Sequence, residues 1–156
     1  MKHPIIAAAF FMLLCPIAQA ADLKGTASVI DGDTLEIHDQ RIRLHGIDAP
    51  EGRQTCTLKG KAWRCGQAAT LALQEKIGNQ TVTCSGKKRD RHQRLVAICT
   101  IGREDLNGWL VANGWALAYR HYSKQYVPQE NQARQARLGI WSSTFTPPWE
   151  WRQANR

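Results

Sequence analysis

The sequence predicts an α+β fold, namely a five-stranded OB-fold β-barrel with three α-helices. Two observations predict it. Short runs of alternating apolar and polar residues, which indicate half-buried strands, occur first as a group of three and later as a pair. Segments with apolar residues at helical spacing follow each group, so the order is three strands, a helix, two strands and two helices. That order fits a small Greek-key barrel closed by a helical C-terminal part.

The first three strands are expected at residues 26–30, 34–38 and 41–45. Leu35 and Ile37 alternate with polar residues in the second run, and Ile42 and Leu44 do so in the third. This alternation is typical of strands with one buried face. The polar segment at residues 38–40 suits a tight turn, so the second and third strands should form a hairpin.

The remaining elements follow a polar loop expected at residues 51–65. They are a helix at 66–77, strands at 80–84 and 95–101, and helices at 105–113 and 129–138. Ala69, Leu73 and Ile77 recur every four residues, which places them on one face of the first helix. Glycines end all three helices, at Gly78, Gly114 and Gly139. The tail beyond them is expected to lie over the body of the domain.

The first 20 residues have the features of an export signal. Lys2 supplies a positive charge, residues 5–14 form an apolar run too short to span a bilayer, and residues 18–20 read Ala-Gln-Ala. We expect cleavage after Ala20, with Ala21 as the alternative, and a periplasmic or secreted protein without a membrane anchor. A chain of 156 residues with no internal repeat or linker should then form one domain over residues 21–156.

Four cysteines remain after cleavage, at Cys56, Cys65, Cys84 and Cys99. An even number in an exported chain indicates two disulfides, and three connectivities are possible. Pairing of Cys84 with Cys99 is favoured because the two lie in adjacent expected strands, which leaves Cys56 for Cys65. The absence of any Cys-x-x-Cys spacing argues against a structural zinc site.

The charge balance points to a polyanionic partner. The full chain carries 21 basic and 13 acidic residues, and loss of Lys2 with the signal leaves 20 against 13, or +7. Residues 85–94 concentrate five cations and one acid, which suits either a solvated hairpin tip or a phosphate contact. Residues 115–127 mix aromatic side chains with cations, which suits either base stacking or ordinary packing.

Three carboxylates flank the expected hairpin. Asp33 precedes it, Asp48 and Glu51 follow it, and Arg43 projects from its second strand. Each residue alone would be an ordinary turn cap, surface acid or strand cation. Gathered on a rigid sheet, the acids would repel one another unless a cation compensated them. The set therefore predicts a site for a hard metal ion and an anionic substrate.

Four segments resemble the staphylococcal nuclease (thermonuclease) family. They are DGDT at residues 31–34, RLHGIDAPE at 43–51, DRHQRL at 90–95 and ARLGIW at 136–141. The resemblance covers residues 26–141, nearly the whole mature chain. It implies a monomeric, calcium-dependent nuclease that hydrolyses the phosphodiester bonds of DNA and RNA. The implied calcium ligands are the side chains of Asp33 and Asp48 and the backbone carbonyl of Ala49.

The same resemblance implies roles for the other site residues. Glu51 would be the general base acting on water near the metal, and Arg43 and Arg94 would hold the scissile phosphate. Asp31 would support the metal ligands, and Tyr122 would match a tyrosine at the nucleotide pocket.

The chain departs from the family pattern at two places. Ala49 replaces a threonine, which a main-chain ligand should tolerate, and His92-Gln93 replaces Tyr-Gly before the second arginine. The main alternative is a non-catalytic nucleic-acid-binding module of the OB type. A third interpretation is a secreted, disulfide-stapled domain that recognises a protein or a polysaccharide.

Overall fold

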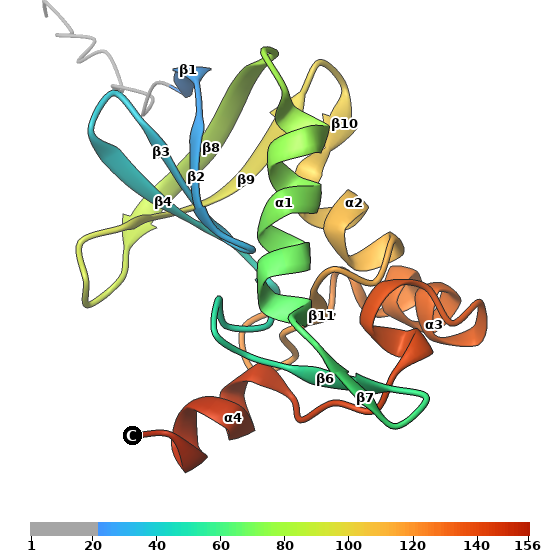
Figure 1. Cartoon of the computed structure of the whole chain (residues 1–156). Helices are drawn as coiled ribbons and strands as arrows, with labels where there is room; N and C mark the ends of the chain where they lie inside the picture. The colour runs from blue at the N-terminus through green and yellow to red at the C-terminus, as the bar shows by residue number, and fades with distance from the viewer. Residues whose placement is uncertain (1–21) are drawn as a thin grey trace, which may run out of the picture.

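The computed structural model describes residues 22–156, so the signal peptide expected at residues 1–20 lies outside the described part. The fold is α+β, as predicted, and a curled sheet forms its main layer (Figure 1). The strands of this sheet are β1 (Leu23–Thr26), β2 (Ser28–Asp31), β3 (Thr34–Ile37), β4 (Gln40–Leu44), β8 (Thr81–Arg89), β9 (Leu95–Ile101) and β10 (Glu104–Asp105).

The sheet curls back on itself in the manner of an OB barrel. Its order is β1-β8-β9-β4-β3-β2, with β10 beside β9. The two ends of this order, β1 and β2, are consecutive in the chain and are separated by Ala27 alone. Strand β2 corresponds to the first expected strand, whereas β1 covers the segment before it, which was not expected to be a strand. The two strands pair with different neighbours. Pairing of β4 with β9 is parallel, and the other pairings in this sheet are antiparallel.

The predicted hairpin is formed by β3 and β4. His38 and Asp39 connect the strands with φ angles of 49° and 60°, and both values lie in the left-handed region used by tight hairpin turns. The alternation read from the sequence is correct, since all four apolar side chains of the hairpin lie in the core: Leu35, Ile37, Ile42 and Leu44. A rigid two-stranded element thus stands at the centre of the sheet.

Three helices occur where they were expected, and a fourth was not predicted. They are α1 (Cys65–Ile77), α2 (Leu106–Ala112), α3 (Val127–Gln135) and the additional α4 (Pro148–Ala154). Helix α1 packs against β2, and α4 lies at the opposite end of the molecule from β1 (Figure 1). Among residues 22–156, no helix is long and apolar enough to cross a membrane.

The polar loop expected at residues 51–65 contains a small hairpin instead. Strands β6 (Cys56–Leu58) and β7 (Lys61–Trp63) pair antiparallel, and Cys56 is disulfide-bonded to Cys65. Thr57 and Thr144 exchange backbone hydrogen bonds of 2.8 and 2.9 Å. The expectation of an irregular loop was wrong because the tail and the disulfide hold this polar segment in a regular conformation.

The favoured disulfide pairing is confirmed. Cys84 and Cys99 lie directly opposite each other on β8 and β9 and form the second bridge, with a sequence separation of 15 residues.

Replacing that pair with Cys84→Val and Cys99→Val should lower the free energy of unfolding by about 3 kcal/mol, because the bridge restricts the unfolded chain. Urea unfolding of the variant and of the wild type would measure the loss. Valine retains most of the apolar volume at these buried positions. Equal midpoints in the two proteins would contradict the prediction.

Candidate active site

Backbone pairing brings two of the predicted acids to one end of the hairpin. Asp33 directly precedes β3, whose first residue pairs with Arg43 of β4. Asp48 belongs to β5 (Ile47–Asp48), which pairs antiparallel with β11 (Leu117–Ala118) so that Asp48 faces Leu117. Each acid is therefore fixed by a strand rather than by a free loop.

Arg43 joins these two acids. Its Nη1 lies 3.0 Å from Oδ2 of Asp33, and its Nη2 donates to Oδ1 of Asp48 at 2.8 Å. Nη1 also donates to the carbonyl of Ile47 at 3.1 Å. One guanidinium thus holds both carboxylates and the backbone beside them, and the sequence-predicted trio is assembled in space.

Asp33 is held in a buried position where its negative charge is costly. Burial raises the pKa of Asp33 to about 7, the charges of Asp31 and Asp48 add to the rise, and Arg43 opposes it. The backbone N–H of Ala49 also donates to Oδ2 of Asp33 at 2.9 Å, which favours the ionised form. A further cation placed beside Asp33 would therefore stabilise its ionised form.

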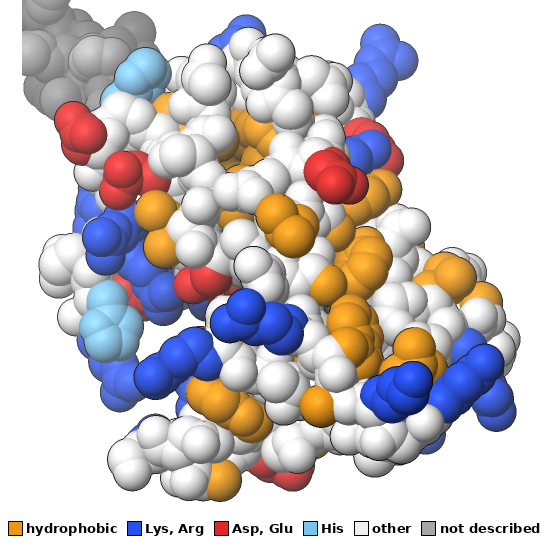
Figure 2. All heavy atoms as spheres, viewed as in Figure 1, with side chains coloured by type: hydrophobic (Ala, Val, Ile, Leu, Met, Phe, Trp, Pro, Cys, Tyr) orange, Lys and Arg blue, Asp and Glu red, His pale blue; other side chains and the backbone are white. Residues whose placement is uncertain are grey.

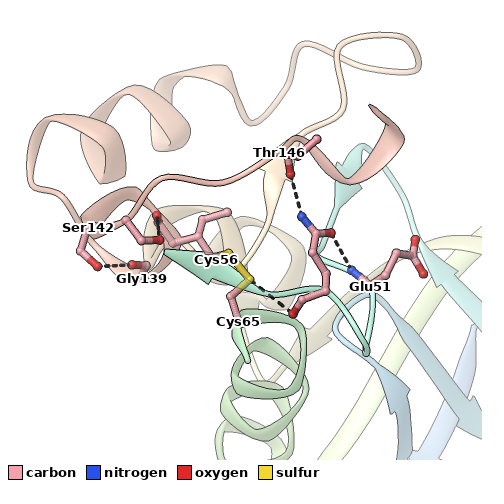
Figure 3. Close-up of a disulfide and its surroundings, with 9 residues drawn as sticks. Glu51, Cys56, Cys65, Gly139, Ser142 and Thr146 are labelled. Atoms are coloured by element: carbon pink, nitrogen blue, oxygen red, sulfur yellow. Dashed lines mark hydrogen bonds between the residues drawn. A yellow bond between two sulfur atoms is a disulfide. The ribbon is translucent and has the colours of Figure 1, made fainter. Parts of the chain in front are cut away.

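Glu51 lies in the segment after β5, and Gln54 links this segment to the tail near Thr146. The backbone N–H of Glu51 donates to Oε1 of Gln54 at 3.2 Å, and Nε2 of Gln54 donates to the carbonyl of Thr146 at 2.7 Å. Figure 3 shows Glu51 and Thr146 on either side of this link, with the disulfide between Cys56 and Cys65 next to it. No sequence pattern pointed to Gln54, which is fully buried.

Arg152 of α4 completes the acid cluster, and the sequence-based reasoning missed it. Its Nη1 donates to Oδ1 of Asp48 at 3.0 Å and to Oε1 of Glu51 at 2.7 Å, and its Nη2 donates to Oδ2 of Asp48 at 2.9 Å. Burial alone would lower the pKa of Arg152, but the hydrogen bonds that it donates to both carboxylates raise the pKa above its ordinary value. The only signal in the sequence was the charge imbalance of three acids against one arginine.

Arg94 lies beside this cluster rather than within it. Its Nε and Nη2 both lie 2.7 Å from Oδ2 of Asp90, and its Nη1 is 3.4 Å from Oγ1 of Thr34. Partial burial would raise the pKa of Asp90, but its hydrogen bonds with Arg94 and with the N–H of His92 lower it. Asp90 therefore stays ionised and keeps the second arginine oriented.

A cleft of about 1060 Å³ opens over these residues. Eight lysine and arginine residues and four acids line it, and the cations include those of the basic segment 85–94. Figure 2 shows lysine and arginine side chains gathered around a hollow on this side of the molecule. The basic segment is thus a wall of the cleft, because β8 extends to Arg89 and brings it beside the acids.

The tyrosines of the aromatic segment 115–127 lie in two different environments, the core and the cleft. Tyr126 is buried in the core, and its hydroxyl donates to Oδ2 of Asp105 at 2.8 Å. Tyr119 and Tyr122 line the cleft instead. Tyr119 stacks on Trp149 of α4 with ring centroids 5.5 Å apart and an interplanar angle of 5°. The cleft therefore has an aromatic wall opposite its basic one.

Two carboxylate side chains are available as metal ligands in this site. Within residues 22–156, no group of three or more His, Cys, Asp and Glu side chains is arranged to hold a metal ion. The expected set of Asp33, Asp48 and the carbonyl of Ala49 needs only two such side chains. Carboxylate and carbonyl oxygens are the ligands that a hard cation prefers. A bound cation would also offset the cost of burying the negative charge of Asp33.

A protein-family model and several known proteins are similar to this chain. The family described as "Staphylococcal nuclease homologue" matches residues 41–143, more than half of the chain. The chain is 31% identical over 168 residues to the micrococcal nuclease of Shigella flexneri, covering 96% of this chain and 91% of that protein. It is 34% identical over 141 residues to an uncharacterized endonuclease of Escherichia coli O157:H7, covering 85% and 86%.

A third relative carries a different kind of name. The succinoglycan biosynthesis protein ExoI of Rhizobium meliloti (strain 1021) is 36% identical over 135 residues, covering 83% of this chain and 71% of that protein. The family match and the extent of all three alignments confirm the resemblance drawn from the four motifs. The chain therefore belongs to the staphylococcal nuclease family.

Proposed function

We propose that this protein is a calcium-dependent nuclease that hydrolyses the phosphodiester bonds of DNA and RNA. The observation that supports it most directly is the contact of Arg43 with both Asp33 and Asp48 at the edge of a cationic cleft, in a chain of a nuclease family. A phosphodiester is negatively charged and repels a nucleophile. A site that hydrolyses it must supply positive charge and a base, and both are present here.

The two arginines would bind the scissile phosphate. A guanidinium offers paired N–H donors that match two phosphate oxygens, which a lysine ammonium does not. Backbone and carboxylate contacts fix the orientation of Arg43, and Asp90 fixes that of Arg94. Neither side chain would have to be ordered when the substrate arrives, so less binding energy is lost on immobilising them.

Asp33, Asp48 and the carbonyl of Ala49 would hold the metal ion. Calcium accepts oxygen ligands in irregular geometry, and this set leaves positions for water and for a phosphate oxygen. When bound, calcium would supply positive charge against the phosphate oxygens. Asp31 would support the set, since its Oδ1 accepts the N–H of Asp33 at 3.0 Å.

Glu51 would take a proton from the attacking water. Its side chain is 35% exposed and carries the negative charge that a general base requires, and its backbone is anchored through Gln54. Glu51 lines the cleft, so its carboxylate, whose Oε1 accepts from Arg152 at 2.7 Å, would reach a water molecule there without rearrangement of the fold.

The test uses the chain without residues 1–20, incubated with plasmid DNA and with single-stranded RNA. Each reaction contains calcium, magnesium, or a chelator. We expect cleavage of both substrates with calcium, and none with the chelator. Cleavage that persists in the chelator would contradict metal dependence. Binding without cleavage under every condition would favour the non-catalytic OB-type module.

The basic wall should supply much of the affinity for nucleic acid. Lys88→Gln with Arg91→Gln removes two exposed cations of the cleft. Loss of two phosphate contacts should make the slope of log K, where K is the binding constant, against log salt concentration less steep by about 1.8. It should weaken the binding of all nucleic-acid sequences alike.

Fluorescence anisotropy with a labelled oligonucleotide at several salt concentrations would measure this slope, in a Glu51→Gln background that prevents cleavage. Lys59→Gln with Lys61→Gln is the matched control, because these exposed lysines of the β6–β7 hairpin lie outside the residues that line the cleft. Equal slopes for the two double variants would contradict the assignment of the basic wall.

Export and a single mature domain complete the proposal. Two disulfides are compatible with an oxidising compartment, as expected for a periplasmic or secreted protein. We propose that residues 1–20 are removed as a signal peptide and that residues 21–156 act as one monomeric domain.

A further inference from the structure

Arg152 occupies the carboxylates that a metal ion would need. Its two terminal nitrogens donate to both oxygens of Asp48, at 3.0 and 2.9 Å, and one of them also donates to Glu51 at 2.7 Å. Oδ1 of Asp48 receives a further hydrogen bond from Arg43 at 2.8 Å. Asp48 is fully buried beneath these two guanidinium groups.

Such contacts compete with metal binding. A carboxylate oxygen that accepts two charged N–H groups has little electron density free for a cation, and two cations at one oxygen repel each other. Arg43 also holds the backbone of Ile47, so it is fixed in place. Arg152 is the group that can yield, because its side chain is 36% exposed and it belongs to the last helix of the chain.

We propose that Arg152 is a built-in counter-cation that occupies the acid cluster in the metal-free protein and is displaced from Asp48 when calcium binds. This inference rests on the proposed calcium-dependent function. Helix α4 thereby has a role at the site, because its Arg152 compensates the charges of Asp48 and Glu51 until the metal binds. The contacts of Arg152 must be broken for the metal to bind, so they lower the affinity for the metal.

Helix α4 is attached in a way that allows this movement. Besides Arg152, α4 lines the cleft with Trp149 and Gln153, and Trp149 stacks on Tyr119. Trp149 also packs against a small apolar cluster of Cys56, Cys65 and Ile140, separate from the barrel core. The guanidinium can therefore swing into the cleft while Trp149 keeps the helix in place.

Calcium titration by isothermal calorimetry tests the proposal without any activity measurement. We expect Arg152→Gln to bind calcium about tenfold more tightly than the wild type, because no charged hydrogen bonds have to be broken first. Arg103→Gln is the matched control, since it removes one exposed cation that lies outside the residues lining the cleft. Its affinity should stay within about twofold of the wild type, because screening weakens exposed charges.

A second measurement reports the displacement itself. In nitrogen-15 NMR spectra, the guanidinium signals of Arg152 can be assigned by their loss in Arg152→Gln. We expect calcium to shift these signals and to speed the exchange of the Nη protons, as the hydrogen bonds to Asp48 break. Calcium binding that leaves the signals unchanged, or an affinity in Arg152→Gln equal to or weaker than that of the wild type, would overturn the inference.

The same titrations separate this inference from the proposed function. Absence of calcium binding in both wild type and Arg152→Gln would overturn calcium dependence, and this inference with it. Calcium binding of equal strength in both, lost in Asp48→Asn, would leave the metal site intact and overturn the role of Arg152 alone.

Discussion

Glu51→Gln should slow cleavage of nucleic acid by about 10²–10⁴-fold, the usual contribution of a general base. Glutamine has nearly the same shape and keeps an oxygen that can accept from Arg152, so the fold and the cleft should be preserved. The backbone link from Glu51 to Gln54 is unaffected by the substitution. The variant loses the carboxylate that would accept a proton from water.

Single-turnover cleavage with calcium would measure the rate, and anisotropy with the same oligonucleotide would measure binding. Binding should remain within a few-fold of the wild type. Glu150→Gln is the matched control, because Glu150 is an exposed acid on α4 without a described ion pair. Turnover in Glu51→Gln equal to that of Glu150→Gln would remove Glu51 from the role of base.

Asp33→Asn should make the metal-free protein more stable at pH 8 while it abolishes calcium binding. Burial raises the pKa of Asp33 from 3.8 to about 7 in the folded protein. As pH rises from 3.8 to 7, the unfolded chain loses this proton while the folded protein keeps it, so stability falls over that window. Above pH 7 the folded protein bears the full cost of a buried charge. Asparagine has no such cost.

The gain should be about 2 kcal/mol at pH 8. It is less than the full shift implies, because asparagine keeps only one of the two oxygens that accept hydrogen bonds from Thr34 and from the N–H of Ala49. It should disappear below about pH 4, where Asp33 is protonated in both states. Urea unfolding in chelator at pH 4 and pH 8 would measure the difference. Asp39→Asn, at an exposed turn position, is the control. A variant less stable than the wild type at pH 8 would contradict the assigned cost of the buried charge.

Both predictions concern residues that the sequence identified before the fold was known. The hairpin that carries Arg43 was predictable because alternation of apolar and polar residues is a local property of a strand. The first three helices were predictable for the same reason, and the adjacency of two expected strands favoured the bridge between Cys84 and Cys99. Helix α4 and the β6–β7 hairpin were missed, and the pairing of that hairpin with Thr144 depends on a segment more than 80 residues away.

The interactions around the acids were not predictable in this way. Arg152 contacts Asp48 and Glu51 across more than 100 residues of chain, and Gln54 reaches Thr146 across 92. In the sequence, Arg152 is one of two arginines in the tail beyond residue 141, and it belongs to no motif. The different positions of Tyr126, in the core, and Tyr119, in the cleft, were also not predictable, because both tyrosines belong to the same aromatic segment.

The sequence by itself determined the β3–β4 hairpin, the first three helices and the family, because periodicity and short motifs are properties of neighbouring residues. It favoured the cysteine pairing without excluding the other two connectivities. The tertiary structure decided how far the barrel curls, how deeply the acids are buried and which cation compensates them. Burial and charge compensation depend on groups brought together from distant segments, so they arise only when the chain has folded. The contact of Arg152 with Asp48 is the clearest instance, and it is the contact that a metal ion would have to break.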